Sequence, residues 1–343
     1  MVHTTSSARA LAAMILCGTG GEVGGQRLRG HPASVAADGP LPDPEPAAER
    51  RTNASFRFGE MAILKIYAWP EPGPHPEVET GLHLGERLRF PAVAPFLGWA
   101  GREEDGAAVA VLHAYLSGGE TAWDRVHRSF AAGGTPDPRE AMRLGQLTAE
   151  LHRALADHRG DEAFRPEPPG PRYSEAFRHS VTALLDRVLP RLPELPAEEI
   201  RHRLLRGSEP AGQTMLQRIH GDYHLEQVRH AGAGLFVLDF EGEPDRPLAK
   251  RRLKHPPEKD LAGMLRSFHY AACAAGAPEG VHEPPSREFL AGYAAAGGRF
   301  DPGLLDLFLM EKAVYEAGYE LDHRPDWLPI PLAGLRALLA GGT

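Results

Sequence analysis

The chain has 343 residues, with 38 Lys and Arg against 46 Asp and Glu, so its formal net charge is −8. This length allows two lobes with a sizeable core, and the acidic balance argues against general affinity for nucleic acid or an anionic membrane. The two cysteines, Cys17 and Cys273, exclude a disulfide framework and suit a cytoplasmic protein. No apolar run reaches the roughly 18 residues of a membrane-spanning helix.

Residues 1–50 form the first predicted segment. They begin with the short apolar stretch "ARALAAMILCG", for which we expect a helix or a buried strand, because no small-residue cleavage site of a signal peptide follows it. They end in "AADGPLPDPEPAAERR", whose Pro, Ala and acidic residues predict an extended linker.

Residues 51–119 predict a small β-rich lobe. Phe56 and Phe58 alternate with polar neighbours and precede the turn Gly59-Glu60, so a β-hairpin is predicted from "ASFRFGE" and "MAILKIYAW". A helix is expected to begin near Pro76. Two further strands are predicted in "VAPFLGWAGR" and "AAVAVLHAYLSGG".

Residues 120–343 predict a larger, mainly helical lobe. Apolar residues recur at helical spacing in "REAMRLGQLTAELHRALADH", and similar patterns continue towards the C-terminus. One short strand, Leu235–Leu238, is expected between two polar loops. A β-rich lobe followed by a helical lobe, with polar motifs in loops, is the plan of a two-lobed protein kinase. We therefore predict an α+β, protein-kinase-like fold.

The strongest chemical signal is the polar stretch "HGDYHLEQVRHAGAGLFVLDFEGEP". Within it Asp222 and Gln227 are five residues apart, the spacing of the base and the metal-binding amide in the kinase catalytic loop. Asp239 ends the hydrophobic run "GLFVLDF", where kinases have a metal-binding aspartate. Each residue alone could belong to a simple turn. Their joint order predicts a site that holds Mg²⁺ and a hydroxyl group.

Lys65, on the predicted strand "AILKIY", is the candidate for binding the phosphates of ATP. The following helix offers Glu77 and Glu79 as partners for its ammonium group, and we favour Glu79. The segment "NASFRFGEM" has a single glycine and lacks the GxGxxG pattern. We therefore expect the hairpin tip to cover the phosphates with Asn53 to Ser55. The predicted cofactors are ATP and Mg²⁺.

Several motifs resemble those of the actinobacterial maltokinases and their relatives, the glucosamine kinases; they are "HGDYHLEQV", "VLDFEGEPDRPLAKRR", "EKDLAGMLRSFHYAA" and "YELDHRPDWLPIPLAG". These are bacterial sugar kinases of the aminoglycoside-phosphotransferase-like fold, and the resemblance extends over residues 50–340. It implies ATP- and Mg²⁺-dependent transfer to a sugar hydroxyl. It also implies Asp222 as the base, Gln227 and Asp239 as metal ligands, and Glu241 as a further metal-binding group.

The chain departs from this family in two places. Glu226 stands in "HLEQ" where the family usually has glycine, and its carboxylate beside the metal site is expected to weaken ATP binding. Residues 1–50 are shorter than the N-terminal cap domain of the family. We interpret them as a shortened cap remnant and linker.

The acceptor is predicted to bind in the helical lobe, facing Asp222. Glu316 could bind sugar hydroxyls or an amine, and Trp327 could stack on a sugar face, although a place in the core is an equal interpretation for Trp327. Maltose, converted to maltose 1-phosphate, is the favoured acceptor. Glucosamine and a cyclitol or other pseudo-sugar are the alternatives.

Two hypotheses outside this set are an aminoglycoside antibiotic phosphotransferase and a non-catalytic nucleotide-binding relative. The first predicts a broad, strongly acidic acceptor pocket, and the second predicts nucleotide binding without turnover. We expect a monomer whose partner is a small sugar-like molecule, with no nucleic acid and no membrane.

Overall fold

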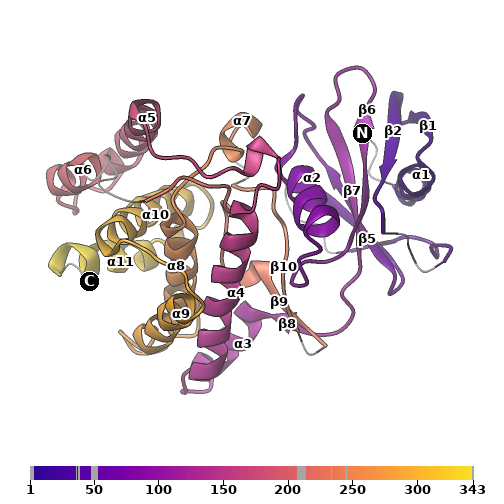
Figure 1. The fold of residues 1–343 in the computed structure, drawn as a ribbon. Helices are drawn as coiled ribbons and strands as arrows, with labels where there is room; N and C mark the ends of the chain where they lie inside the picture. Colours follow the sequence, from indigo (N-terminus) through magenta and orange to yellow (C-terminus); the bar gives the residue numbers. More distant parts are fainter. Residues whose placement is uncertain are drawn as a thin grey trace. The chain divides into compact units, whose positions relative to one another are not determined.

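The structure is a computed structural model, and it describes residues 4–35, 37, 39–47, 53–206, 214–232, 234–243 and 246–341. The chain divides into two compact units. Unit 1 contains residues 1–120, 220–222 and 227–253, and unit 2 contains residues 121–219, 223–226 and 254–343. Figure 1 shows that unit 1 is built around a sheet and unit 2 mainly from helices.

A seven-stranded antiparallel sheet forms the centre of unit 1, in the order β1-β2-β6-β7-β5-β4-β3. Its strands are β1 (Gly20–Val23), β2 (Gln26–Pro32), β3 (Glu45–Pro46), β4 (Asn53–Phe58), β5 (Ala62–Tyr67), β6 (Phe96–Arg102) and β7 (Ala108–Ala114). The predicted hairpin is confirmed as β4 and β5. Its register pairs Phe56 with Leu64, both buried, and Ser55 with Lys65. Since strand neighbours alternate between faces, Lys65 and Ser55 share the face opposite this apolar core.

Helix α1 (Thr5–Cys17) packs on the sheet of unit 1, where Leu11 and Ile15 are fully buried. It approaches β2 so closely that a Cβ at Gly30 would lie 2.0 Å from the carbonyl oxygen of Met14. The apolar stretch is thus a helix, one of the two structures expected for it. The hairpin of β1 and β2 was not predicted. The predicted boundary at residue 50 lies outside the described residues, as does part of the predicted linker.

Helix α2 (Pro76–Thr80) begins at the predicted proline and continues as a wider turn of π-helix, η1 (Gly81–Arg87). Unit 1 also contains β9 (Val228–Ala231), β10 (Gly234–Val237) and the short helix α7 (Leu248–Arg251). Strand β10 corresponds to the predicted strand before Asp239. It belongs to a small sheet of order β10-β9-β8, in which β8 is Glu120–Thr121.

Unit 2 confirms the predicted helical segments. Its helices are α3 (Ala122–Ala131), α4 (Pro138–Ala156), α5 (Pro171–Val188), α6 (Ala197–Arg206), α8 (Glu258–Ala274), α9 (Glu283–Ala295), α10 (Pro302–His323) and α11 (Pro329–Ala340). Short 3₁₀ turns join some of them: η2 (Glu162–Phe164), η3 (Leu189–Arg191) and η5 (Pro325–Trp327). A further 3₁₀ turn, η4 (Leu225–Gln227), directly precedes β9. Within the described parts of the chain, no helix has the length and apolarity needed to cross a membrane.

Candidate active site

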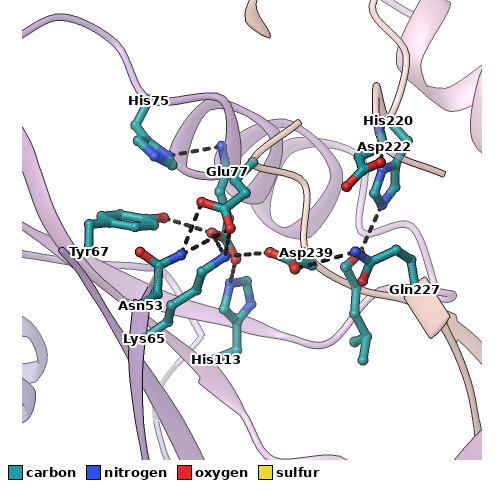
Figure 2. Close-up of polar contacts among 12 residues, drawn as sticks. Asn53, Lys65, Tyr67, His75, Glu77, His113, His220, Asp222, Gln227 and Asp239 are labelled. Carbon is teal, nitrogen blue, oxygen red and sulfur yellow. Dashed lines mark hydrogen bonds and ion pairs between the residues drawn. The ribbon is translucent and has the colours of Figure 1, made fainter. Parts of the chain in front are cut away.

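Lys65, on β5, lies at the centre of a cluster of carboxylates in unit 1 (Figure 2). Its ammonium group is 2.9 Å from Glu77 Oε2 and 3.0 Å from Glu241 Oε1, and it also bonds the carboxylate of Asp239. Burial disfavours the charged form of Lys65, but the three carboxylates outweigh burial and raise the pKa of the ammonium group. Lys65 is therefore a positive charge shared by three acids.

Glu77, and not Glu79, is the partner of Lys65, so our preference for Glu79 was wrong. Tyr67 also donates a hydrogen bond of 2.7 Å to Glu77 Oε2. Burial disfavours the carboxylate form of Glu77, but Lys65 outweighs it and holds the pKa of Glu77 below its usual value. Glu79 lies two positions further along the helix, about 200° around its axis. It binds Arg252 instead, through two contacts of 2.7 Å.

Asn53 and Ser55 do not lie at the tip of the hairpin, and this part of the prediction was wrong. The turn contains Gly59, whose φ of 56° suits glycine, whereas Asn53 pairs with Tyr67 at the open end. The Asn53 amide donates to both carboxylate oxygens of Glu241, at 3.0 and 3.2 Å. Ser55 shares the face of Lys65, so a contact with ATP stays a prediction for it.

The segment His220-Gly221-Asp222 is held against the end of β10. His220 Nε2 donates to the carbonyl oxygen of Leu238 at 2.9 Å, which leaves Nδ1 as the acceptor for the Asp222 backbone N–H at 3.3 Å. Gly221 has a φ of 87°, in the region that side chains disfavour. These contacts give His220 a structural role. They fix the backbone of Asp222 beside Leu238, the residue that precedes Asp239.

Asp239 lies between two groups of side chains. Figure 2 shows the Lys65–Glu77 pair on one side of it, and Asp222 and Gln227 on the other. The amide nitrogen of Gln227 is 3.4 Å from Asp239 Oδ2. Asp239 has a φ of 65°, which is uncommon for a residue with a side chain and is typical of functional sites.

The carboxylates of Glu77, Asp239 and Glu241 can approach a single cation, because one oxygen of each lies within 4.8 Å of the others. Burial raises the pKa of Glu241, although Lys65 opposes this, so its carboxylate form gains from a further positive charge. Mg²⁺ prefers carboxylate and carbonyl oxygens. A buried group of three acids around one ammonium therefore fits this ion.

Glu316 and Trp327, the predicted acceptor residues, belong to unit 2 and have protein partners there. Glu316 on α10 accepts from Arg266 Nε at 2.8 Å and lies 2.7 Å from Arg266 Nη2. The ring of Trp327 stacks on that of Tyr270 at 6.3 Å, and the guanidinium group of Arg324 lies 4.7 Å from its centre. Their contact with an acceptor stays a prediction.

Tyr67 and His75 are two further residues of the site that were not predicted from the sequence. Tyr67 follows Lys65 by two positions, so the strand period places both on one face, and this signal was available. His75 precedes Pro76 at the start of α2 and accepts from the Glu77 backbone N–H at 3.3 Å. Its ring stacks on Tyr67 at 4.0 Å. The two residues together fix the carboxylate of Glu77.

Kinases are among the known proteins with similar sequences and folds, whereas no family model matches the chain. A glucosamine kinase of Streptacidiphilus jiangxiensis is 28% identical over 323 residues, which cover 84% of this chain and 72% of the relative. A glucosamine kinase structure in complex with glucosamine, ADP and inorganic phosphate is similar with a TM-score of 0.73 and 24% identity, over 97% of this chain and 82% of that chain. A GDP complex of a point mutant of aminoglycoside 2′-phosphotransferase-IIIa is similar with a TM-score of 0.52 and 16% identity, over 88% of this chain and 93% of that chain.

The predicted fold class is confirmed: the chain has an α+β, aminoglycoside-phosphotransferase-like kinase fold. This fold and the cluster around Lys65 define a phosphotransferase with an alcohol group as acceptor. Its cofactors are ATP and Mg²⁺, in agreement with the fit of the carboxylates to that ion.

Proposed function

We propose that the chain is a glucosamine kinase, which transfers the γ-phosphoryl group of ATP to the 6-hydroxyl of glucosamine. The proposal depends chiefly on the similarity to a glucosamine kinase over 84% of this chain. Maltose, which the sequence analysis favoured, becomes the second candidate. The residues around Lys65 are compatible with either sugar, because they bind ATP rather than the acceptor.

Lys65 has the role of binding the phosphates of ATP. Its ammonium group now bonds Asp239 and Glu241 as well as Glu77. Asp239, Glu241 and the amide oxygen of Gln227 would hold Mg²⁺, and Lys65, still paired with Glu77, would bind phosphate oxygens of ATP. The ion would supply neutralisation of the phosphate charge.

Asp222 has the role of the base. Its carboxylate orients the attacking hydroxyl and accepts its proton, while His220 holds the backbone through the contacts at Leu238 and Asp222. The transition state of phosphoryl transfer is loose, so catalysis depends mainly on such positioning and on electrostatic stabilisation.

A phosphorylation assay with ATP and Mg²⁺ tests this function, with glucosamine, maltose, glucose, a C7 cyclitol and kanamycin as acceptors. We expect turnover of glucosamine above all others. Asp222→Asn, which keeps the size of the side chain, should reduce kcat at least about 100-fold and leave ATP affinity unchanged. Preference for maltose or kanamycin would overturn the proposed acceptor. ATP binding without turnover of any acceptor would indicate the non-catalytic hypothesis.

Glu316 and Trp327 remain our proposed acceptor residues. The amine of glucosamine is a cation, which a carboxylate such as Glu316 attracts. If Glu316 binds this amine, Glu316→Gln should raise the KM for glucosamine and leave the KM for glucose unchanged. Equal effects on both sugars, with a lower melting temperature, would assign Glu316 to the pair with Arg266 alone.

A further inference from the structure

An ion pair connects helix α2 to the segment that follows α7. The guanidinium group of Arg252 donates from Nε and Nη2 to the two carboxylate oxygens of Glu79, each at 2.7 Å. The side chains are 31% and 16% exposed, and the residues are 173 positions apart in the sequence. A two-point contact between a planar guanidinium and a carboxylate defines orientation as well as distance.

The segment Leu248–Arg252 also reaches the acids around Lys65. The Leu248 backbone N–H donates to Glu71 at 3.3 Å, just before α2. Arg251 Nη1 lies 3.9 Å from Glu241 Oε2, and the Cβ and Cγ atoms of Arg251 pack against Gly242. One short segment thus contacts both sides of the nucleotide site: the helix that carries Glu77, and the loop that carries Glu241.

Glu77 and Glu79 lie on one helix of five residues, so the helix cannot rotate without moving both. The few hydrogen bonds of so short a helix hold its rotation weakly, and the turn that follows is a π-helix. We propose that Arg252 and Glu79 are positioning residues for nucleotide binding. Their ion pair fixes the rotation of α2 at which Glu77 faces Lys65.

This assignment explains how the nucleotide site is assembled in the unmodified chain. In protein kinases, the equivalent lysine–glutamate pair depends on a helix whose position is controlled by phosphorylation of a loop. Here a guanidinium–carboxylate pair within unit 1 supplies the same restraint permanently. The inference rests on the protein being an ATP-dependent phosphotransferase. It does not depend on which sugar is the acceptor, because ATP affinity can be measured without a sugar.

The test measures the Kd for ATP and Mg²⁺ by calorimetry in Arg252→Gln, Arg252→Lys and Glu79→Gln. We expect Arg252→Gln to weaken binding about tenfold, since small displacements of binding groups have effects of this size. Arg252→Lys should retain part of the affinity. The exchanged pair Glu79→Arg with Arg252→Glu should recover most of it. Arg102→Gln is the matched control, because it removes another two-point pair of unit 1, with Asp105 at 2.8 and 2.6 Å.

A double-mutant comparison separates positioning from general stability. If Arg252 acts through Glu77, then Arg252→Gln should cause no further loss of ATP affinity in a Glu77→Gln background. Two results would overturn the inference: additive losses in that background, or a Kd for Arg252→Gln within about twofold of the control Arg102→Gln. These readouts need no acceptor. Failure to phosphorylate glucosamine would therefore reject the proposed function without deciding whether Arg252 and Glu79 position α2.

Discussion

Two groups of ionic side chains, one in each unit, differ in their balance of charge. In unit 1, one ammonium group, that of Lys65, is shared by three carboxylates. In unit 2, two acids of α10 each have a guanidinium group of their own: Glu316 pairs with Arg266, and Glu320 pairs with Arg324. The first cluster carries excess negative charge, whereas the second consists of balanced pairs.

This difference separates a binding site from a stabilising one. Buried charges are costly unless they are paired, so balanced pairs are tolerated in a folded core and attract a further ion less strongly than an excess of acids does. An excess of buried carboxylates is unfavourable until a cation joins them. Such unbalanced clusters are typical of functional sites. Substitutions in the two clusters should therefore affect different properties of the protein.

The largest effect is expected for Asp239→Asn, in the unbalanced cluster. The substitution keeps the size of the side chain but removes the charge that Mg²⁺ needs, so kcat should fall about 1000-fold. Stability should not decrease, because one of three mutually repelling acids is lost. Steady-state kinetics and a thermal melt in the absence of ATP measure the two properties. A clear fall in melting temperature would show that the cluster around Lys65 is mainly structural.

A smaller effect, on stability rather than on kcat, is expected for Arg266→Gln in unit 2. It leaves Glu316 buried without its guanidinium partner, which should lower the free energy of unfolding by about 4 kcal/mol. Urea denaturation measures the change. Arg287→Gln is the control, because its pair with Glu283 is exposed and should be worth about 0.5 kcal/mol. Similar losses in both variants would contradict the contrast between buried and exposed pairs.

The sequence predicted the parts of the site that depend on local pattern. Lys65 could be placed on a strand because the alternation around it and the turn at Gly59 identify a hairpin. The choice between Glu77 and Glu79 could not be made in this way. It depends on the rotation of α2, which is set by Tyr67, by the cap at His75 and by Arg252, which is 173 positions away from Glu79.

The fold, too, could be predicted only where it depends on local sequence pattern. Long helices such as α4 and α10 have a period that identifies them without knowledge of their neighbours. The hairpin of β1 and β2 was missed because its sequence is rich in glycine and alternates weakly. Its place in the sheet depends on pairing with β6, in which Leu28 lies opposite Arg102. Pairing between strands so far apart in the chain is not encoded in a local pattern.

Acid should destabilise unit 1 through His75. Burial is the main reason that its pKa is lowered to about 4, with Glu77 opposing and Lys65 contributing. Below the ordinary value of 6.5, the unfolded chain takes up a proton that the folded chain does not. Stability should therefore fall as the pH decreases from 6.5 towards 4, by about 2 to 3 kcal/mol at pH 4.5.

His75→Asn tests this pH dependence, because asparagine can still cap α2 but does not titrate. Its stability, measured by urea denaturation, should change less than that of the unmodified protein between pH 6.5 and pH 4.5. The exposed His179 provides the control His179→Asn, which should retain the full dependence. If His75→Asn has the same pH profile as the unmodified protein, groups other than His75 cause the loss of stability in acid.

The smallest effect is expected at Glu226, the acid that we interpreted as a departure from the family motif. Glu226 is exposed, and charges in solvent are screened within about 8 Å at physiological ionic strength. Glu226→Gln should therefore strengthen the binding of ATP and Mg²⁺ only about twofold at low salt, and less at high salt. Glu150 is an exposed residue of α4, so Glu150→Gln is the control for a general change in net charge. A gain much larger than this, persisting in high salt, would mean that Glu226 acts as a direct part of the unbalanced cluster. The excess negative charge of the site would then be a limit on ATP affinity as well as the source of metal binding.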